Sequence, residues 1–175
     1  MSLHTGLEFV KHYHAHLDAV HDLQASTDGQ RLCTTSADKT IKFYDIVGFD
    51  MINMLNLTFT PTCAAWISDR GRKGRVAVAD AGSGAIRIYF SEGEQGEAAH
   101  LLELHAAPVK CLAFNAPLGT CVSLDAKGTI EYWSSADYGA PPVGATSFKY
   151  KVRDSASTQY IAYLACYLCM LALYW

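Results

Sequence analysis

Short hydrophobic stretches with polar residues between them recur along this chain, and turn-forming residues separate them. Three stretches, Thr40–Tyr44, Ala85–Tyr89 and Thr129–Trp133, are rich in β-branched and aromatic residues and carry one charged residue at the centre, which is typical of β-strands. Turn signals such as Thr27-Asp28-Gly29 recur at intervals of about 8–12 residues. No segment up to Lys151 has helical periodicity. The pattern therefore predicts an all-β chain.

These stretches repeat with a nearly constant period. Their terminal aromatic residues, Tyr44, Tyr89 and Trp133, follow one another at intervals of 45 and 44 residues. In the first and third copies a histidine, His16 or His105, precedes the aromatic residue by 28 positions. A period of roughly 40–45 residues is that of a four-stranded propeller blade of the WD type. We therefore predict a partial WD-repeat β-propeller of about three blades plus one outer strand.

The predicted strands divide among these blades. The single outer strand lies near residues 7–13. The strands of the three blades lie near residues 18–24, 30–35, 40–45 and 51–57, then 62–67, 75–79, 85–90 and 98–104, then 108–114, 119–124, 128–133 and 146–151. Residues 1–151 are thus expected to form the partial propeller, and residues 152–175 a linker and an uncharged apolar tail outside it.

We assign the polar residues of each copy to a buried chain of hydrogen bonds. In WD repeats a loop histidine, a turn aspartate, a strand hydroxyl and a strand tryptophan bond to one another, because buried indole and imidazole groups need partners. The first copy can supply His16, Asp38, one hydroxyl among Thr34, Thr35 and Ser36, and Tyr44 in place of tryptophan. The third copy supplies His105 and Trp133, with Lys127 at the aspartate position and Asp125 two residues earlier. The middle copy keeps only Tyr89, so we expect the second and third networks to be eroded.

The same residues could be mistaken for a catalytic set. His16, Asp38 and a hydroxyl formally resemble a Ser/His/Asp triad, but the repeat context favours a structural role. Alternating histidines at His12, His14 and His16 could capture a metal adventitiously, and Cys166 and Cys169 form a lone CxxC; neither has the partners of a physiological metal site. We expect no catalytic residues, no metal and no cofactor.

Charge and cysteine content restrict the partners and the compartment. The chain has 14 basic and 17 acidic residues, a net charge of −3, so direct nucleic-acid binding is not expected. The cluster Arg70–Arg75 is interpreted as a solvated strand connection. The N-terminus shows no secretory signal, and the six cysteines lack framework spacing, which favours reduced thiols in a cytosolic or nuclear protein.

The chain resembles the WD-repeat region of nuclear cyclophilin-type peptidyl-prolyl isomerases. The residues that carry the resemblance span about 6–151 and include Gly6–His12, Ile41–Val47, Ala77–Asp80, Lys127–Ser134 and Ser147–Lys151. The resemblance implies a nuclear protein-interaction scaffold, with spliceosomal components or histones as possible partners. It also implies that isomerase activity resides in a C-terminal cyclophilin domain, for which this chain has no room, so we expect this chain not to be an enzyme.

Three alternatives to this interpretation remain open. The chain could be a WD-repeat adaptor of an unrelated complex, such as a ligase substrate receptor, or it could have the isomerase activity of the full-length family. The uncharged segment Tyr160–Trp175 could make it a tail-anchored membrane protein, although a span needs about twenty apolar residues. That segment could otherwise cover an open blade edge, or be a non-native end. We favour a non-native end because the family-like sequence stops at Lys151, and we do not expect membrane association.

Overall fold

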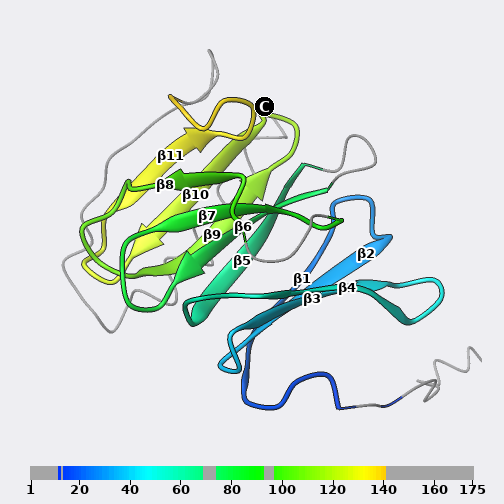
Figure 1. Ribbon diagram of the computed structural model, residues 1–175. Coiled ribbons are helices and arrows are strands. Elements are labelled where there is room, and N and C mark those ends of the chain that lie inside the picture. Colours follow the sequence, from blue (N-terminus) through cyan, green and yellow to red (C-terminus); the bar gives the residue numbers. More distant parts are fainter. Residues whose placement is uncertain (1–11, 13, 69–73, 93–96, 141–175) are drawn as a thin grey trace, which may run out of the picture.

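The fold consists of three antiparallel sheets that fan out side by side (Figure 1). The computed structural model describes residues 12, 14–68, 74–92 and 97–140. Within these residues every regular element is a strand, which confirms the all-β prediction and, with the arrangement of the sheets, the partial propeller. The first sheet has the order β1 (Val20–Ala25), β2 (Arg31–Ser36), β3 (Thr40–Asp45), β4 (Asp50–Asn56). The second has the order β5 (Pro61–Ser68), β6 (Arg75–Asp80), β7 (Ile86–Phe90), β8 (His100–Leu102), and the third has β9 (Val109–Asn115), β10 (Thr120–Asp125), β11 (Ile130–Ser134), with β10 in the middle.

The observed strands follow the predicted ones closely, with one clear difference. Residues 98–104 were predicted as a strand, but β8 covers only His100–Leu102 and pairs with β7 through three residues. The predicted strands at 7–13 and 146–151, and the predicted tail at 152–175, lie outside the described residues. Over the described part of the chain, no helix has the length and apolar character needed to cross a membrane.

The first strands of the sheets, β1, β5 and β9, contact one another in sequence order. This is the arrangement of inner strands in a propeller, where each sheet is one blade. Hydrogen bonds link the first blade to the second at this inner edge, and one of them joins His21 Nδ1 to the Pro61 carbonyl oxygen at 2.6 Å. The indole N–H of Trp66 donates to the carbonyl of Gln24 at 3.0 Å, and the backbone N–H of Ala64 donates to Asp22 Oδ2 at 2.9 Å. Buried polar groups at the blade contact are thereby satisfied.

The hydrophobic core lies between the blades, and the second blade contributes to it from both faces. Trp66 on β5 packs toward the first blade with Phe43, at 5.8 Å between ring centroids in an edge-to-face arrangement. Ile67, the next residue on β5, belongs to the cluster shared with the third blade, which contains Trp133. Successive side chains of a strand point to opposite faces. A blade that is covered on both sides must therefore be apolar at consecutive positions, as the β5 and β6 sequences are.

Gly84 marks the closest approach between the second and third blades. A Cβ atom at Gly84 would lie 1.9 Å from the carbonyl oxygen of His105 and 3.0 Å from that of Ala107. No side chain fits in that space, because real Cβ contacts are much longer. The β6–β7 turn thus meets the loop before β9 backbone to backbone, and only glycine permits it.

Candidate functional site

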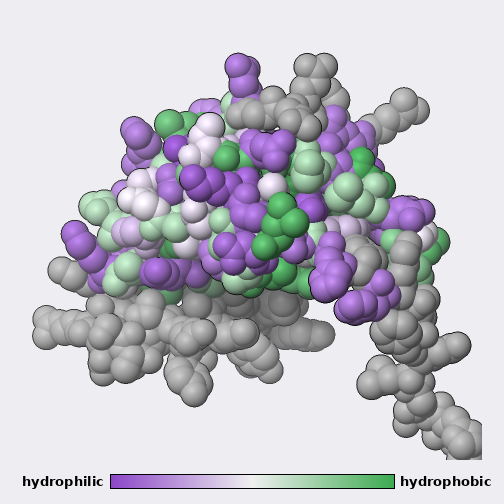
Figure 2. Space-filling model, turned by 60° about the horizontal axis from the view of Figure 1, so that its bottom comes forward, coloured by the Kyte–Doolittle hydropathy of each residue, from purple (hydrophilic) through white to green (hydrophobic). Residues whose placement is uncertain are grey.

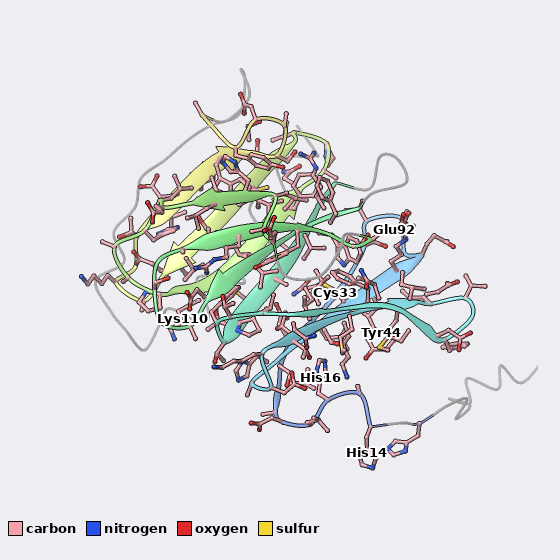
Figure 3. All side chains as sticks on the ribbon, in the orientation of Figure 1. His14, His16, Cys33, Tyr44, Glu92 and Lys110 are labelled. Atoms are coloured by element: carbon pink, nitrogen blue, oxygen red, sulfur yellow. The ribbon has the colours of Figure 1, made fainter. Side chains whose placement is uncertain are left out.

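In the first blade a hydrogen-bonded chain joins a loop histidine to a turn aspartate and a strand hydroxyl. His16 Nδ1 lies 3.0 Å from Asp38 Oδ2, and His16 Nε2 lies 2.7 Å from Thr34 Oγ1. Only 1% of the His16 side chain and 8% of the Asp38 side chain are exposed. Figure 3 shows His16 close to the first sheet and His14 farther out on the preceding segment. The structure thus brings His16 and Asp38 together and selects Thr34 among the three candidate hydroxyls.

Asp38 is held as a carboxylate by the groups around it. It accepts hydrogen bonds from the backbone N–H of Leu17 at 3.0 Å and from the Thr40 hydroxyl at 2.6 Å. Burial by itself raises the pKa of Asp38, but the hydrogen bonds from Thr40, Leu17 and His16 outweigh burial and hold the pKa well below its ordinary value. An ionised carboxylate only accepts, so His16 Nδ1–H donates to it, and in the neutral imidazole Nε2 then accepts the Thr34 hydroxyl proton.

The third blade contains a corresponding chain that ends on tryptophan. His105 Nε2 lies 2.7 Å from Ser123 Oγ, to which the indole N–H of Trp133 donates at 3.3 Å. His105 Nδ1 lies 3.4 Å from Asp125 Oδ2. The hydroxyl follows the histidine by 18 residues in both blades. The repeat that we expected to be eroded therefore keeps three of its four groups in place, and only the carboxylate comes from a shifted position, Asp125.

Ser123, His105 and Asp125 have the residue types and the hydrogen-bonded arrangement of a catalytic triad, but the Ser123 hydroxyl is buried away from solvent. Ser123 is completely buried, and the side chains of His105 and Asp125 are 0% and 2% exposed. The Ser123 oxygen also accepts the Trp133 N–H. A nucleophile must reach the reacting carbon of a substrate, and this oxygen cannot do so in the folded blade. The arrangement is suited to holding strands together.

The middle blade replaces the histidine chain by an arginine chain that the sequence did not reveal. Arg87 Nη1 donates to Asp80 Oδ2 at 3.1 Å, and the Arg87 guanidinium lies 4.3 Å from the centroid of the Phe59 ring. Gly82 N–H and the Ser83 hydroxyl also donate to Asp80, at 2.8 and 3.0 Å. Burial raises the pKa of Asp80, but these hydrogen bonds and the Arg87 charge more than compensate and lower the pKa below its ordinary value.

The three terminal aromatic residues occupy one structural position. Tyr44 pairs with Leu32, Tyr89 with Val76 and Trp133 with Cys121, each on the strand before it in its sheet. All three side chains are buried, at 4%, 4% and 1% exposure. Burial raises the pKa of the Tyr89 phenol. The structural register therefore agrees with the repeat period read from these residues.

Ser123, Asp80 and Arg87 are network residues that the sequence reasoning missed. Ser123 could have been found from the sequence, because it follows His105 by 18 residues, as Thr34 follows His16. Arg87 was seen only as a charged residue in the middle of a strand. The residue that corresponds to Thr34 in the middle blade is Val78, since it pairs with Arg87 as Thr34 pairs with Lys42. No hydroxyl at that position signalled a network.

The cysteines and histidines of the described residues do not form a metal centre. Burial raises the pKa of the Cys63 thiol to about 12 and raises those of Cys33 and Cys121 as well, so these thiols are neutral core groups. The His12 and His14 rings lie 5.8 Å apart, and both side chains are exposed. Among the residues that the structure describes, no group of three His, Cys, Asp or Glu side chains could hold a metal ion.

Comparison with known proteins agrees with this architecture. The family model described as "WD domain, G-beta repeat" matches residues 7–45. A solved chain in the structure titled "Crystal Structure of Mitotic Checkpoint Complex" superposes with a TM-score of 0.58 at 17% sequence identity, covering 75% of this chain and 36% of that one. At this identity the likeness concerns the fold alone.

Curated relatives point to a narrower group. The peptidyl-prolyl cis-trans isomerase cyp15 of Rhizopus delemar is 42% identical over 74% of this chain, and CYP71 of Arabidopsis thaliana is 36% identical over 78%. The human peptidylprolyl isomerase domain and WD repeat-containing protein 1 is 37% identical over 74%. The aligned part is 20–22% of the length of each relative. The chain thus contains WD repeats and matches the WD-repeat region of the peptidylprolyl isomerase domain and WD repeat-containing proteins.

Proposed function

We propose that this chain is a non-catalytic protein–protein interaction scaffold, part of the WD-repeat region of a spliceosome- or chromatin-associated cyclophilin in the nucleus. The observation that carries the proposal is the burial of the hydrogen-bonded polar networks. The networks of His16, Asp80 and His105 face inward and are bonded within the blades. Loops and blade edges remain as the surface on which partners can be bound, as WD repeats and a propeller neighbour from a multiprotein complex also suggest.

Protein partners fit the surface chemistry better than nucleic acid. The net charge of −3 opposes the phosphate contacts that dominate nucleic-acid affinity. Hydrophobic residues lie among hydrophilic ones on the face seen in Figure 2. Large exposed hydrophobic side chains occur at several blade positions, including Val47, Met51 and Leu101. Such side chains act as anchors when a protein partner covers them.

Proximity labelling in nuclei tests the scaffold proposal. The full chain fused to a biotin ligase should label spliceosomal or chromatin proteins above the level of the ligase alone. A labelled set made of ubiquitin-ligase subunits would instead support the alternative of a WD-repeat adaptor in an unrelated complex. A set identical to that of the ligase alone would contradict any scaffold role.

An isomerase assay tests the catalytic alternative, which is suggested by the names of the relatives. The purified chain should leave the cis–trans isomerisation of a prolyl peptide at its uncatalysed rate. Without a catalyst this isomerisation takes tens to hundreds of seconds at 25 °C. A cyclophilin added at the same concentration serves as the positive control. Acceleration that rises in proportion to the concentration of this chain would overturn the non-catalytic proposal.

A further inference from the structure

The third blade buries apolar side chains on the face that points away from the second blade. Val122, Leu124 and Ile130 form a cluster of their own and are 4%, 2% and 5% exposed. Cys121 and Trp133, at alternating positions of the same strands, belong to the core shared with the second blade. Because successive side chains of a strand point to opposite faces, the cluster lies on the far side of the sheet. We call these three residues the onward face.

The third blade by itself does not account for this burial. Among the described residues, every member of the cluster, including the partly buried Cys111 and Tyr132, lies on β9, β10 or β11. These strands form one sheet, at the end of the fan away from the first blade (Figure 1). Neighbours within a sheet cover the flanks of a side chain but not its tip, which stands perpendicular to the sheet. Burial to 5% exposure or less therefore needs a further cover on this face.

In the first two blades, an arginine links the sheet to the blade that follows it. Arg31, the first residue of β2, donates to Glu92 Oε1 of the second blade at 2.6 Å. Arg75, the first residue of β6, donates to the Tyr138 hydroxyl of the third blade at 3.0 Å. Thr120 is the first residue of β10, and its hydroxyl donates to a carbonyl of its own turn at 3.2 Å. The third blade thus has no arginine at this position to hold a further blade, and an apolar segment suits its onward face better.

Outside the described residues, one long segment of the chain carries no charge. Tyr160–Trp175 has no Asp, Glu, Lys, Arg or His. Charged residues occur in each of the other stretches outside the described part: residues 1–11, 69–73, 93–96 and 141–159. Burial of an unpaired charge against apolar side chains is costly. Residues 141–159, at about 3.3 Å per extended residue, are long enough to bring the uncharged segment to any point of the third blade.

We propose that Tyr160–Trp175 covers the onward face of the third blade, in the place that the following blade takes on the first two. Apolar side chains of the segment would pack on Val122, Leu124 and Ile130 and remove them from water. The inference is independent of the scaffold proposal, and it departs from the expectation that residues 152–175 lie outside the propeller. It implies that the onward face is closed to partners, which bind elsewhere on the blades.

Natural cysteines test the proposal in the intact chain. Cys111 packs against the onward face, and Cys166 and Cys169 lie in the uncharged segment. A short bismaleimide should join Cys111 to Cys166 or Cys169 within one chain, which mass spectrometry of the digested monomer would detect. The control is Cys33, in the core between the first and second blades. Equal yields of links to Cys33 and to Cys111, or links found only between two chains, would overturn the proposal.

Removal of the segment should uncover the onward face. Val122→Cys places a thiol on that face, and the native thiol of Cys121 points to the opposite face of β10. Deletion of residues 160–175 should raise the labelling rate of the thiol at position 122 about tenfold and change that of Cys121 by less than about twofold. An unchanged rate at position 122 would contradict the proposal. The cross-link in the intact chain remains decisive if the deletion also lowers stability.

Charge placed within the segment distinguishes a cover from a membrane anchor. Leu164→Asp combined with Leu168→Asp should raise labelling at position 122 as the deletion does, because carboxylates resist burial. The matched control, Ser155→Asp combined with Ser157→Asp, adds the same charge before the segment and should leave labelling unchanged. Equal effects of the two pairs would overturn the proposal. Sedimentation of the full chain with phosphatidylcholine vesicles, lost on deletion of residues 160–175, would also overturn it, because lipid would then be the surface that the segment binds.

Discussion

The networks of the first and third blades use similar residue types but differ in the hydrogen bonds of their hydroxyl groups. Both carboxylates are junctions: Asp38 accepts from Leu17 and Thr40 beside His16, and Asp125 accepts the backbone N–H groups of Lys127 and Thr129 beside His105. In the third blade Ser123 is a second junction, because it bonds to His105 and to Trp133, whereas Thr34 in the first blade bonds to His16. The comparison teaches that a WD network can keep its carboxylate junction while its hydroxyl junction varies. Single substitutions should therefore have different costs at equivalent positions.

The largest effect is expected when the indole of the third blade is removed. Trp133→Ala should lower the free energy of unfolding by about 3–5 kcal/mol, because it leaves a cavity in the core between the second and third blades. Urea unfolding measures the loss. Buried thiols react with a labelling reagent when the structure around them opens. The labelling rate should rise more at Cys121, which pairs with Trp133, than at Cys33 in the first blade. Equal increases at both cysteines would contradict separate blade contacts.

A smaller effect is expected when the junction of the first blade is removed. Asp38→Ala should cost about 2–3 kcal/mol, because the Leu17 N–H and the Thr40 hydroxyl each lose a charged acceptor and His16 loses its partner. The control is Asp18→Ala, since Asp18 is exposed and accepts from its neighbour Ala19. A loss in the Asp18 variant as large as that in the Asp38 variant would argue against a central carboxylate.

The hydroxyl positions sharpen the comparison further. Ser123→Ala should cost about 1–3 kcal/mol, because two buried groups lose their partner, and Thr34→Val about 1 kcal/mol, because only His16 does. Thr35→Val is the matched control for Thr34. The Thr35 hydroxyl is buried and has no hydrogen-bond partner among the described residues, so this change should be neutral or stabilising. Unfolding midpoints compared under one condition decide the order.

The smallest effect is expected at the onset of acid destabilisation, near pH 4. The folded-state pKa of Asp38 lies below the unfolded value, so the stabilisation is fully present above the unfolded pKa of about 3.9 and is lost as pH falls through the folded pKa. Acid titration of the wild-type chain should therefore show a loss that begins near pH 4 and grows below it. Asp38→Asn should reduce this loss, and an unchanged acid profile would contradict the assignment.

Much of the fold could be predicted because the strands of each blade are marked by residues close together in the sequence. The β3, β7 and β11 sequences alternate and end on Tyr44, Tyr89 and Trp133, so the strands and the repeat period followed from nearby residues, and the observed pairing places the three aromatic residues at one register position. The contacts between blades could not be predicted. The donation of the Trp66 N–H to Gln24 joins residues 42 positions apart, and it depends on the angle at which two sheets pack.

The middle network escaped prediction for a related physical reason. A buried carboxylate needs donors, but several residue types can supply them. Asp80 receives them from Arg87, Ser83 and a backbone N–H instead of from a histidine. Sequence reasoning that looks for one residue type at one position finds a gap there, although the electrostatic requirement is met.

The close approach at Gly84 suggests how such variation is tolerated. Where the β6–β7 turn meets His105, the contact is made by main-chain atoms, so its geometry does not change when the neighbouring side chains are exchanged. The distance between the second and third blades at this point is then set by the polypeptide backbone. With that spacing fixed, a histidine in one blade and an arginine in the next can each bond to a buried carboxylate, and the side chains of each network can differ between blades.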